Sequence, residues 1–230
     1  MEKLLDKNTS EYHLPFKGVI LDMDGTLIAS TEADFLAWKS TFTDYGKELS
    51  YETYFPMLGM KSQDVIRKIL KLDGEDVDQA LSKKMAHFEE IMNVKGIEPI
   101  PHAEDLLIKL HQLPIKVALA TSSRKMKMRL VMKKLDFLKY FDEAVTGEEV
   151  HNSKPHPDIF LLAAKKLNLA AEDCVVIEDA ANGVTAAKSA GMKCIAITTT
   201  HNRAQLEHAD IVIDTFEEID FEHLCSTVRG

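Results

Sequence analysis

Short apolar segments alternate with amphipathic helical segments from residue 98 onward, and this alternation limits the fold more than any other feature of the chain. Strands are expected at 116–120, 143–146, 175–177, 194–197 and 211–213, and helices at about 102–112, 125–135, 157–167 and 182–190. Alternating strands and helices favour a parallel sheet with helices on both faces. The sequence therefore predicts an α/β fold.

A further strand at 17–21 precedes this alternation and is separated from it by a block with a purely helical pattern. Aromatic residues at spacings of three and four, Trp38 among them, mark one helix, and others are expected at 62–72 and 76–93. Pro99 and Pro101 mark the end of the block. We therefore expect a discontinuous core domain, residues 1–30 and 98–230, with a helical cap domain, residues 31–97, inserted after the first strand.

Composition excludes several kinds of partner. The 230 residues carry a net charge of −9, which disfavours nucleic acid and anionic membranes, because both repel an acidic protein. No apolar run has the length of a signal peptide or of a membrane span. The three cysteines form no C-x-x-C pair, so neither a disulfide framework nor a zinc site is expected. A cytoplasmic protein, monomeric by default, is the simplest interpretation.

Two aspartates, Asp22 and Asp24, follow directly after the first strand. In open α/β sheets the active site lies beyond the carboxyl ends of the strands. The spacing of two residues directs both side chains to the same side of an extended chain. Two carboxylates so placed repel each other unless a cation lies between them. Mg²⁺, a hard cation that takes oxygen ligands, fits this pair.

Two other interpretations of this Asp-x-Asp-Gly segment need comparison. Calcium loops also contain the pattern, but here Ala33 stands at the twelfth position, where such a loop carries Glu, and the third acidic ligand is missing. An ordinary turn at the end of a strand also uses Asp and Gly. The residues of this segment alone leave that second alternative open.

Acidic residues also follow the strand expected at 175–177. Glu178 and Asp179 are adjacent there, and two acids at the end of an apolar strand are unfavourable unless a cation lies nearby. A second side of the metal site explains both residues. The alternative is that Asp179 caps the helix that follows.

Two more segments at strand ends carry groups suited to phosphate. Thr121, Ser122 and Ser123 precede a helix, where hydroxyl and N–H groups bind phosphate, although a plain helix cap is the alternative. Lys154 lies between Ser153 and Pro155 and can reach a phosphoryl oxygen as a point charge, unless it is only solvated. Four strand ends thus supply a nucleophile, phosphate donors, a neutralising cation and metal ligands, which together indicate phosphoryl chemistry.

Four segments resemble, in order, the motifs of the haloacid dehalogenase (HAD) superfamily. They are Asp22-Met23-Asp24-Gly25-Thr26, Ala120-Thr121-Ser122-Ser123, Lys154-Pro155-His156-Pro157-Asp158 and Ile177-Glu178-Asp179-Ala180-Ala181-Asn182-Gly183. The similarity covers nearly the whole chain after about residue 16. The subgroup that the chain resembles contains β-phosphoglucomutase and many small-metabolite phosphatases. The resemblance implies a Rossmann-like core and a helical-bundle cap that closes over the site.

The resemblance also implies a role for each aspartate. Asp22 is expected to attack phosphorus and form an aspartyl-phosphate. Asp24 is expected to protonate the leaving oxygen and then to deprotonate the attacking water. Asp22, the backbone carbonyl of Asp24 and Asp179 are expected to bind Mg²⁺, with Glu178 acting directly or through water.

The remaining motifs receive binding roles from the same resemblance. Thr121 and the N–H group of Ser122 are expected to hold phosphoryl oxygens, and Ser123 is grouped with the substrate-binding residues. Lys154 is expected to neutralise the charge that the phosphoryl group shares with Asp22. This is the positioning and electrostatic stabilisation that phosphoryl transfer chiefly requires.

Departures from the mutase pattern favour a phosphatase of a small phosphorylated metabolite. Mutases carry a histidine in a pattern like His-x-x-Ala-Trp, and here Asp34 replaces it. They also carry a Gly-x-Ser-Arg segment, and here Ser62 stands at the arginine position, with Lys61 as an unequal substitute. Thr26 stands where mutases usually have an aliphatic residue. A mutase is the first alternative, and a non-catalytic binding protein on the same fold is the second.

The cap is expected to select the leaving group of the substrate. Candidate selectors are Asp34, Trp38, Lys61, Ser62 and His87 on the cap, with Arg124 and Lys125 at the rim of the core. Packing within the cap is the alternative for Trp38, and plain solvation is the alternative for Arg124 and Lys125. A sugar phosphate is the first expectation for the substrate, and a nucleotide-type monophosphate is the second.

Overall fold

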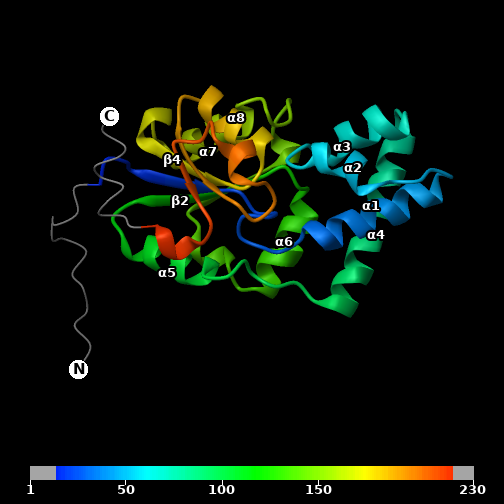
Figure 1. Cartoon of the computed structure of the whole chain (residues 1–230), viewed down its shortest axis with the longest axis horizontal. Helices are drawn as coiled ribbons and strands as arrows, with labels where there is room; N and C mark the ends of the chain where they lie inside the picture. Colours follow the sequence, from blue (N-terminus) through cyan, green and yellow to red (C-terminus); the bar gives the residue numbers. More distant parts are fainter. Residues whose placement is uncertain (1–13, 220–230) are drawn as a thin grey trace.

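Residues 14–219 are described in a computed structural model of the chain (Figure 1). The strands are β1 (Gly18–Leu21), β2 (Lys116–Thr121), β3 (Glu143–Thr146), β4 (Cys174–Glu178), β5 (Lys193–Ile197) and β6 (Ile211–Ile213). They form one sheet in the order β3-β2-β1-β4-β5-β6, and every neighbouring pair is parallel. The predicted α/β fold is confirmed, and each expected strand lies within one residue of its observed bounds.

The register of β1 explains how distant motifs meet. Leu21, the last residue of β1, pairs with Leu119 on one side and with Ile177 on the other. Since all three strands run in the same direction, the residues that follow them emerge at one edge of the sheet. Asp22 is therefore placed between the segment that begins at Thr121 and the one that begins at Glu178.

Four helices cover the two faces of the sheet: α5 (Ala103–Gln112), α6 (Lys125–Lys134), α7 (Asp158–Leu167) and α8 (Ala181–Ser189). Successive side chains of a strand point to opposite faces. Val19 and Leu21 accordingly pack in one buried cluster with residues of α5 and α6, and Ile20 packs in a second with residues of α7 and α8. The polar residues at the strand ends therefore stand on a sheet that is buried on both faces.

The helical block between β1 and β2 lies beyond one end of the sheet (Figure 1). It contains α1 (Thr31–Asp44), α2 (Tyr51–Tyr54), α3 (Ser62–Val65) and α4 (Glu75–Lys95), with a π-helical turn at Ile66–Leu70 after α3. Trp38, Phe42, Ile66 and Leu81 belong to a buried cluster formed within this block. The division into domains at residues 31 and 97 stays a prediction, and the block is called the cap below.

The structure shows where two of the cysteines lie and whether any helix could span a membrane. Cys174 and Cys194 are free and lie in the buried cluster that includes residues of α7 and α8, whereas Cys225 lies outside the described residues. Within residues 14–219, no helix is both long and apolar enough to cross a membrane.

Candidate active site

A buried ammonium group joins two of the predicted acids. Lys154 Nζ lies 2.6 Å from Asp22 Oδ1 and 2.6 Å from Glu178 Oε1, and the Lys154 side chain is 0% exposed. Burial disfavours the charged ammonium, but the carboxylates of Asp22 and Glu178 outweigh burial and raise the pKa of Lys154 above its usual value. Lys154 is therefore held as a cation against the predicted nucleophile.

Glu178 is bound by the protein at both of its oxygens. Oε1 accepts the bond from Lys154, and Oε2 accepts the backbone N–H groups of Asp179 and Ala180 at 2.7 Å. A Cβ on Gly183 would stand 1.9 Å from Oε1, so only glycine at this turn of α8 leaves room for the carboxylate. These bonds orient the Glu178 side chain toward Lys154. Contact between Glu178 and a metal stays a prediction.

Asp179 lies next to this pair and is held by two threonines. Thr26 Oγ1 donates to Oδ1 at 2.7 Å, and Thr200 Oγ1 donates to Oδ2 at 2.5 Å. Gly25 has a φ of +85°, and a Cβ there would stand 2.2 Å from Oδ2. The glycine of the Asp-x-Asp-Gly segment is thus required both by its backbone conformation and by the close approach of Asp179.

These groups leave an excess of buried negative charge. The buried groups are three carboxylates, those of Asp22, Glu178 and Asp179, and one ammonium, that of Lys154, which pairs with the first two, so together they carry a net charge of −2 when all are ionised. Burial, with Glu178 and Asp24 nearby, raises the pKa of Asp22 to about 7 despite the bond from Lys154. Burial, with Glu178 and Asp22 nearby, also raises the pKa of Asp179 well above its usual value.

The excess of buried negative charge is of the kind that a bound Mg²⁺ would neutralise. Buried carboxylates with raised pKa values are stabilised by a divalent cation, and Mg²⁺ prefers oxygen ligands. Within residues 14–219, no group of three His, Cys, Asp or Glu side chains forms a ready-made metal cage. That finding is compatible with Mg²⁺, which uses one or two carboxylates and keeps several waters. The chemistry of the donor set therefore fits the predicted metal.

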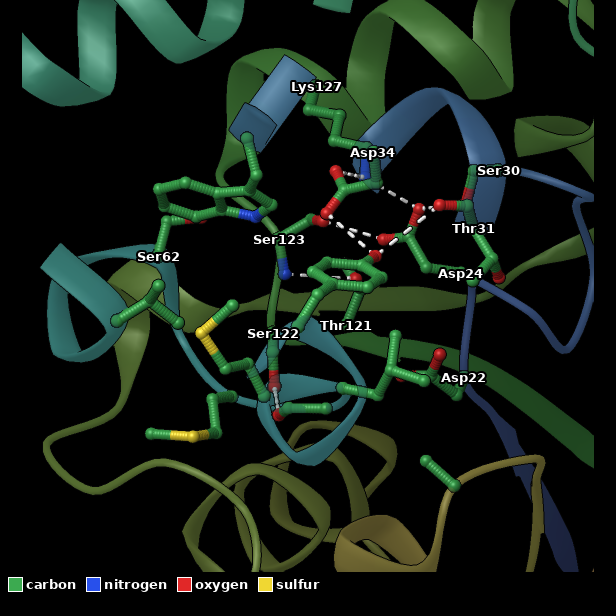
Figure 2. Close-up of a pocket in the computed structure, with 18 of the residues that line it drawn as sticks. Asp22, Asp24, Ser30, Thr31, Asp34, Ser62, Thr121, Ser122, Ser123 and Lys127 are labelled. Atoms are coloured by element: carbon green, nitrogen blue, oxygen red, sulfur yellow. Dashed lines mark hydrogen bonds and ion pairs between the residues drawn. The ribbon is translucent and has the colours of Figure 1, made fainter. Parts of the chain in front are cut away.

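Asp24 lies at the opening between the core and the cap. Its Oδ1 accepts hydrogen bonds from Ser30 Oγ at 2.5 Å and from Lys127 Nζ at 2.7 Å, and its Oδ2 accepts one from Ser123 Oγ at 2.6 Å. Figure 2 shows Ser30, Ser123 and Lys127 converging on this carboxylate. The sequence placed Asp24 and Ser123 in the site, whereas Ser30 and Lys127 were not predicted.

The segment after β2 contacts both the site and the cap. The N–H group of Ser123 donates to Thr121 Oγ1 at 3.1 Å, which closes a tight turn at the end of the strand. Ser122 Oγ donates to the carbonyl of Gly59 in the cap at 2.6 Å. The hydroxyl of Ser122 therefore binds the cap to the core. The phosphate-binding role predicted for this residue involves its N–H group and not its hydroxyl.

Asp34, on α1, forms an ion-paired network with two lysines that the sequence did not indicate. Asp34 Oδ1 contacts Lys84 Nζ and lies 2.9 Å from Lys127 Nζ. Burial would raise the pKa of Asp34, but the two ammonium groups outweigh burial and lower it. Each lysine belongs to a helix face that also carries buried apolar residues, such as Leu81 beside Lys84 and Val131 beside Lys127. A lysine on an otherwise apolar helix face was the sequence signal that could have identified these two residues.

A family model described as haloacid dehalogenase-like hydrolase matches residues 19–197, which is more than half of the chain. The chain belongs to the haloacid dehalogenase-like hydrolase family. This confirms the family predicted from the four motifs.

The chain is similar to two named proteins and to one solved structure. It is 36% identical over 200 residues to Protein SUPPRESSOR OF QUENCHING 1, chloroplastic, of Arabidopsis thaliana, a match that covers 83% of this chain and 19% of that protein. It is 30% identical to a Phosphorylated carbohydrates phosphatase of Thermotoga maritima, covering 88% of this chain and 96% of the relative. A crystal structure of β-phosphoglucomutase from Clostridium difficile shares the fold, with a TM-score of 0.84, 24% identity and coverage of 93% and 97%.

One pocket of this HAD protein brings together most of the predicted site residues (Figure 2). Both motif segments at β1 and β2 contribute, as does the Glu178-Asp179 pair. The predicted residues that line the pocket are Asp22, Asp24, Asp34, Trp38, Ser62, Thr121, Ser122, Ser123, Glu178 and Asp179. Tyr54, Lys84 and Lys127 line it as well and were not predicted.

Four other residues predicted to select the leaving group form contacts outside this pocket. Lys61 Nζ donates to the carbonyls of Val150 and His151, so this lysine fastens the cap to the core. Arg124 Nε pairs with a carboxylate oxygen of Glu148, whose other oxygen accepts the N–H group of Lys125. His87 Nε2 lies 3.0 Å from an oxygen of Asp44 on the cap surface. Substrate contact by these residues stays a prediction that their observed partners do not support.

Proposed function

We propose that the chain is a Mg²⁺-dependent phosphatase that hydrolyses a small phosphorylated metabolite through an aspartyl-phosphate on Asp22. One observation carries the proposal: Asp22 lies in a buried, negatively charged cluster, with Lys154 Nζ 2.6 Å from one of its oxygens. A phosphatase has to bring together a carboxylate nucleophile and positive charge for the phosphoryl oxygens. Catalysis of the phosphatase type agrees with the HAD relatives.

In the first half of the reaction, an oxygen of Asp22 attacks phosphorus while the bond from phosphorus to the leaving oxygen breaks. Asp24 donates a proton to the leaving oxygen, so that it departs as an alcohol. Lys154 stabilises the charge on the phosphoryl group and on Asp22. Thr121 and the N–H group of Ser122 orient the phosphoryl oxygens from the end of β2.

In the second half, a water molecule attacks the phosphorus of the aspartyl-phosphate. Asp24, now ionised, accepts the proton of that water, and the bond between phosphorus and Asp22 breaks. The products are inorganic phosphate and the original carboxylate. Asp22, the carbonyl of Asp24 and Asp179 would hold Mg²⁺, which when bound neutralises negative charge on the phosphoryl group.

The pocket charges favour a phosphatase over a mutase of the same family. A mutase that handles bisphosphates needs cations for a second phosphate. In the part of the chain that the structure describes, the lysines lining the pocket, Lys84 and Lys127, both pair with Asp34. Lys61, the candidate substitute for an arginine, is bound to backbone carbonyls instead. A sugar phosphate is the first candidate substrate, in line with the name of the Thermotoga relative.

The cap also has to move during the reaction cycle we propose. The pocket encloses about 60 Å³ of water-accessible space, far less than the ~300–1,000 Å³ typical of ligand sites. Admission of a sugar phosphate therefore requires displacement of cap residues such as Tyr54 and Met57, which line the pocket. The cytoplasmic location and monomeric state inferred from the sequence stay predictions.

The proposal is tested by phosphate release in the presence of Mg²⁺ across sugar phosphates, nucleoside monophosphates and pyrophosphate. The panel includes β-glucose 1-phosphate with and without glucose 1,6-bisphosphate. We expect selective release of inorganic phosphate from one class of monoester. Conversion of β-glucose 1-phosphate to glucose 6-phosphate without net phosphate release would show a mutase instead.

Mg²⁺ is expected to stabilise the protein in the absence of any substrate. At a hundredfold excess over Kd, a ligand adds ~2.7 kcal/mol, which for a chain of this size raises Tm by about 5–10 °C. Metal-free Asp22, with its pKa raised to about 7, holds a proton that the unfolded chain releases above pH ~4. Stability in EDTA should therefore fall as pH rises toward 7, and the Mg²⁺ shift should be larger at pH 8 than at pH 6.

Differential scanning fluorimetry measures this shift, and Asp179→Asn serves as the comparison. The variant keeps the size of the side chain but removes the anionic ligand, so it should lose most of the Mg²⁺ response. Equal shifts in both proteins would argue against Asp179 as a ligand.

A further inference from the structure

Asp34 is the only acid that pairs with both lysines lining the pocket, among residues 14–219. Its Oδ1 contacts Lys84 Nζ of the cap and lies 2.9 Å from Lys127 Nζ of the core. The side chains of Lys84 and Lys127 are 7% and 5% exposed. Charges so thoroughly removed from water interact strongly, because little solvent screens them.

The balance of charge on this side of the pocket depends on Asp34. Lys127 also contacts Asp24, at 2.7 Å, so two acids match two lysines. Lys84 has Asp34 as its only ion-pair partner among the described residues, and it otherwise lies over the rings of Trp38 and Phe88. Burial already lowers the pKa of Lys84, so without the Asp34 carboxylate this lysine would face the pocket with no ion-pair partner among the described residues until a phosphate entered.

The second oxygen of Asp34 remains available as an acceptor. Oδ1 accepts both lysines, whereas Oδ2 has one contact in the described part of the chain, a long one of 3.4 Å from the Tyr54 hydroxyl. A carboxylate oxygen with free lone pairs readily accepts a hydrogen bond from a hydroxyl group and repels a phosphate oxygen. Figure 2 shows Asp34 beside Asp24, the residue that we propose protonates the leaving oxygen.

We propose that Asp34 determines substrate specificity by cancelling the charges of Lys84 and Lys127. The pocket then accepts a neutral leaving group that bears hydroxyl groups and rejects substrates that carry a second phosphate. This inference rests on the proposed phosphatase function, which it deepens by stating the charge of the leaving group. A carboxylate at position 34 thus favours hydrolysis of monophosphates and disfavours reactions of bisphosphates.

The test compares two sugar phosphates as competitors of p-nitrophenyl phosphate hydrolysis, one with a single phosphate and one with two. Fructose 1-phosphate and fructose 1,6-bisphosphate differ by one phosphate and are titrated against the wild-type protein and Asp34→Asn. In the wild type, the bisphosphate should bind no better than the monophosphate. In Asp34→Asn, the ratio of inhibition constants should move at least about tenfold toward the bisphosphate, and added salt should reduce that gain.

Two further variants separate charge from general damage. Asp34→Asn/Lys84→Met removes the cation that the first substitution leaves unmatched, so the ratio should return toward the wild-type value. Asp44→Asn makes the same substitution elsewhere on α1, where Asp44 pairs with Lys83 and His87 outside the pocket, and should leave the ratio unchanged.

Lys84→Met keeps the inference testable if Asp34→Asn fails to fold. This variant removes a cation and leaves Asp34 in place, so the ratio should shift severalfold against the bisphosphate. A ratio that stays within about twofold of wild type in folded Asp34→Asn, or in Lys84→Met, would overturn the specificity role of Asp34. Failure of the wild type to hydrolyse p-nitrophenyl phosphate in an Asp22-dependent manner would instead refute the proposed function.

Discussion

Asp22→Asn is expected to lower kcat by at least about four orders of magnitude, the scale seen when a catalytic nucleophile is removed. An amide is a poor nucleophile and cannot form the acyl phosphate on which the proposed route depends. The fold should survive, because Asn has nearly the same volume and Asp22 belongs to a cluster with excess negative charge. Removing one of those charges should leave Tm in EDTA unchanged or higher.

The experiment needs a second substitution because Asn can deamidate to Asp and restore activity slowly. Asp22→Ala cannot revert in this way and should be equally inactive. Steady-state phosphate release and thermal unfolding are measured on both purified variants. Wild-type turnover by either folded variant would show that Asp22 is not the nucleophile.

Lys154→Met is expected to destabilise the protein by about 3–5 kcal/mol, the usual result of breaking a buried ion pair from one side. The Lys154 side chain is 0% exposed and bridges Asp22 and Glu178, so its loss leaves two buried carboxylates without their cation. Activity should also fall by at least about a hundredfold, because the phosphoryl group loses its neutralising charge. Urea unfolding and phosphate release measure the two effects separately.

A compensating substitution distinguishes the structural role of Lys154 from its chemical role. Lys154→Met/Glu178→Gln removes one of the unmatched carboxylates and should recover part of the lost stability, while activity stays low. Lys133→Met, on the exposed side of α6, is the matched control and should change neither property. Recovery of activity along with stability would mean that Lys154 acts only through folding.

The fold was largely predictable because its signals are local. Each strand of the sheet is a short apolar run bounded by glycine, proline or polar residues, and its position follows from those few residues. The same holds for the polar residues at the strand ends, since parallel pairing brings the carboxyl ends of neighbouring strands together. Asp22, Thr121, Glu178 and Asp179 lie at one edge of the sheet for this reason.

The contacts between the cap and the core were not predictable in the same way. Lys61 was predicted to bind substrate, but its direction is set by carbonyl groups some 90 positions further along the chain. Lys127 meets Asp34 across 93 positions, and Thr200 meets Asp179 through a loop after β5. Such contacts depend on how helices and loops are placed in three dimensions, which local periodicity does not encode.

The central claim is that phosphate passes through a covalent intermediate on Asp22, and a trapping experiment tests it most directly. The protein is mixed with Mg²⁺ and a substrate from the phosphate-release panel, quenched within one turnover, and treated with borohydride, which reduces an acyl phosphate to an alcohol. Mass spectrometry of the peptide that contains residue 22 should then show homoserine at that position. Unmodified Asp22 throughout a productive turnover, or the modification at another acid, would contradict the mechanism.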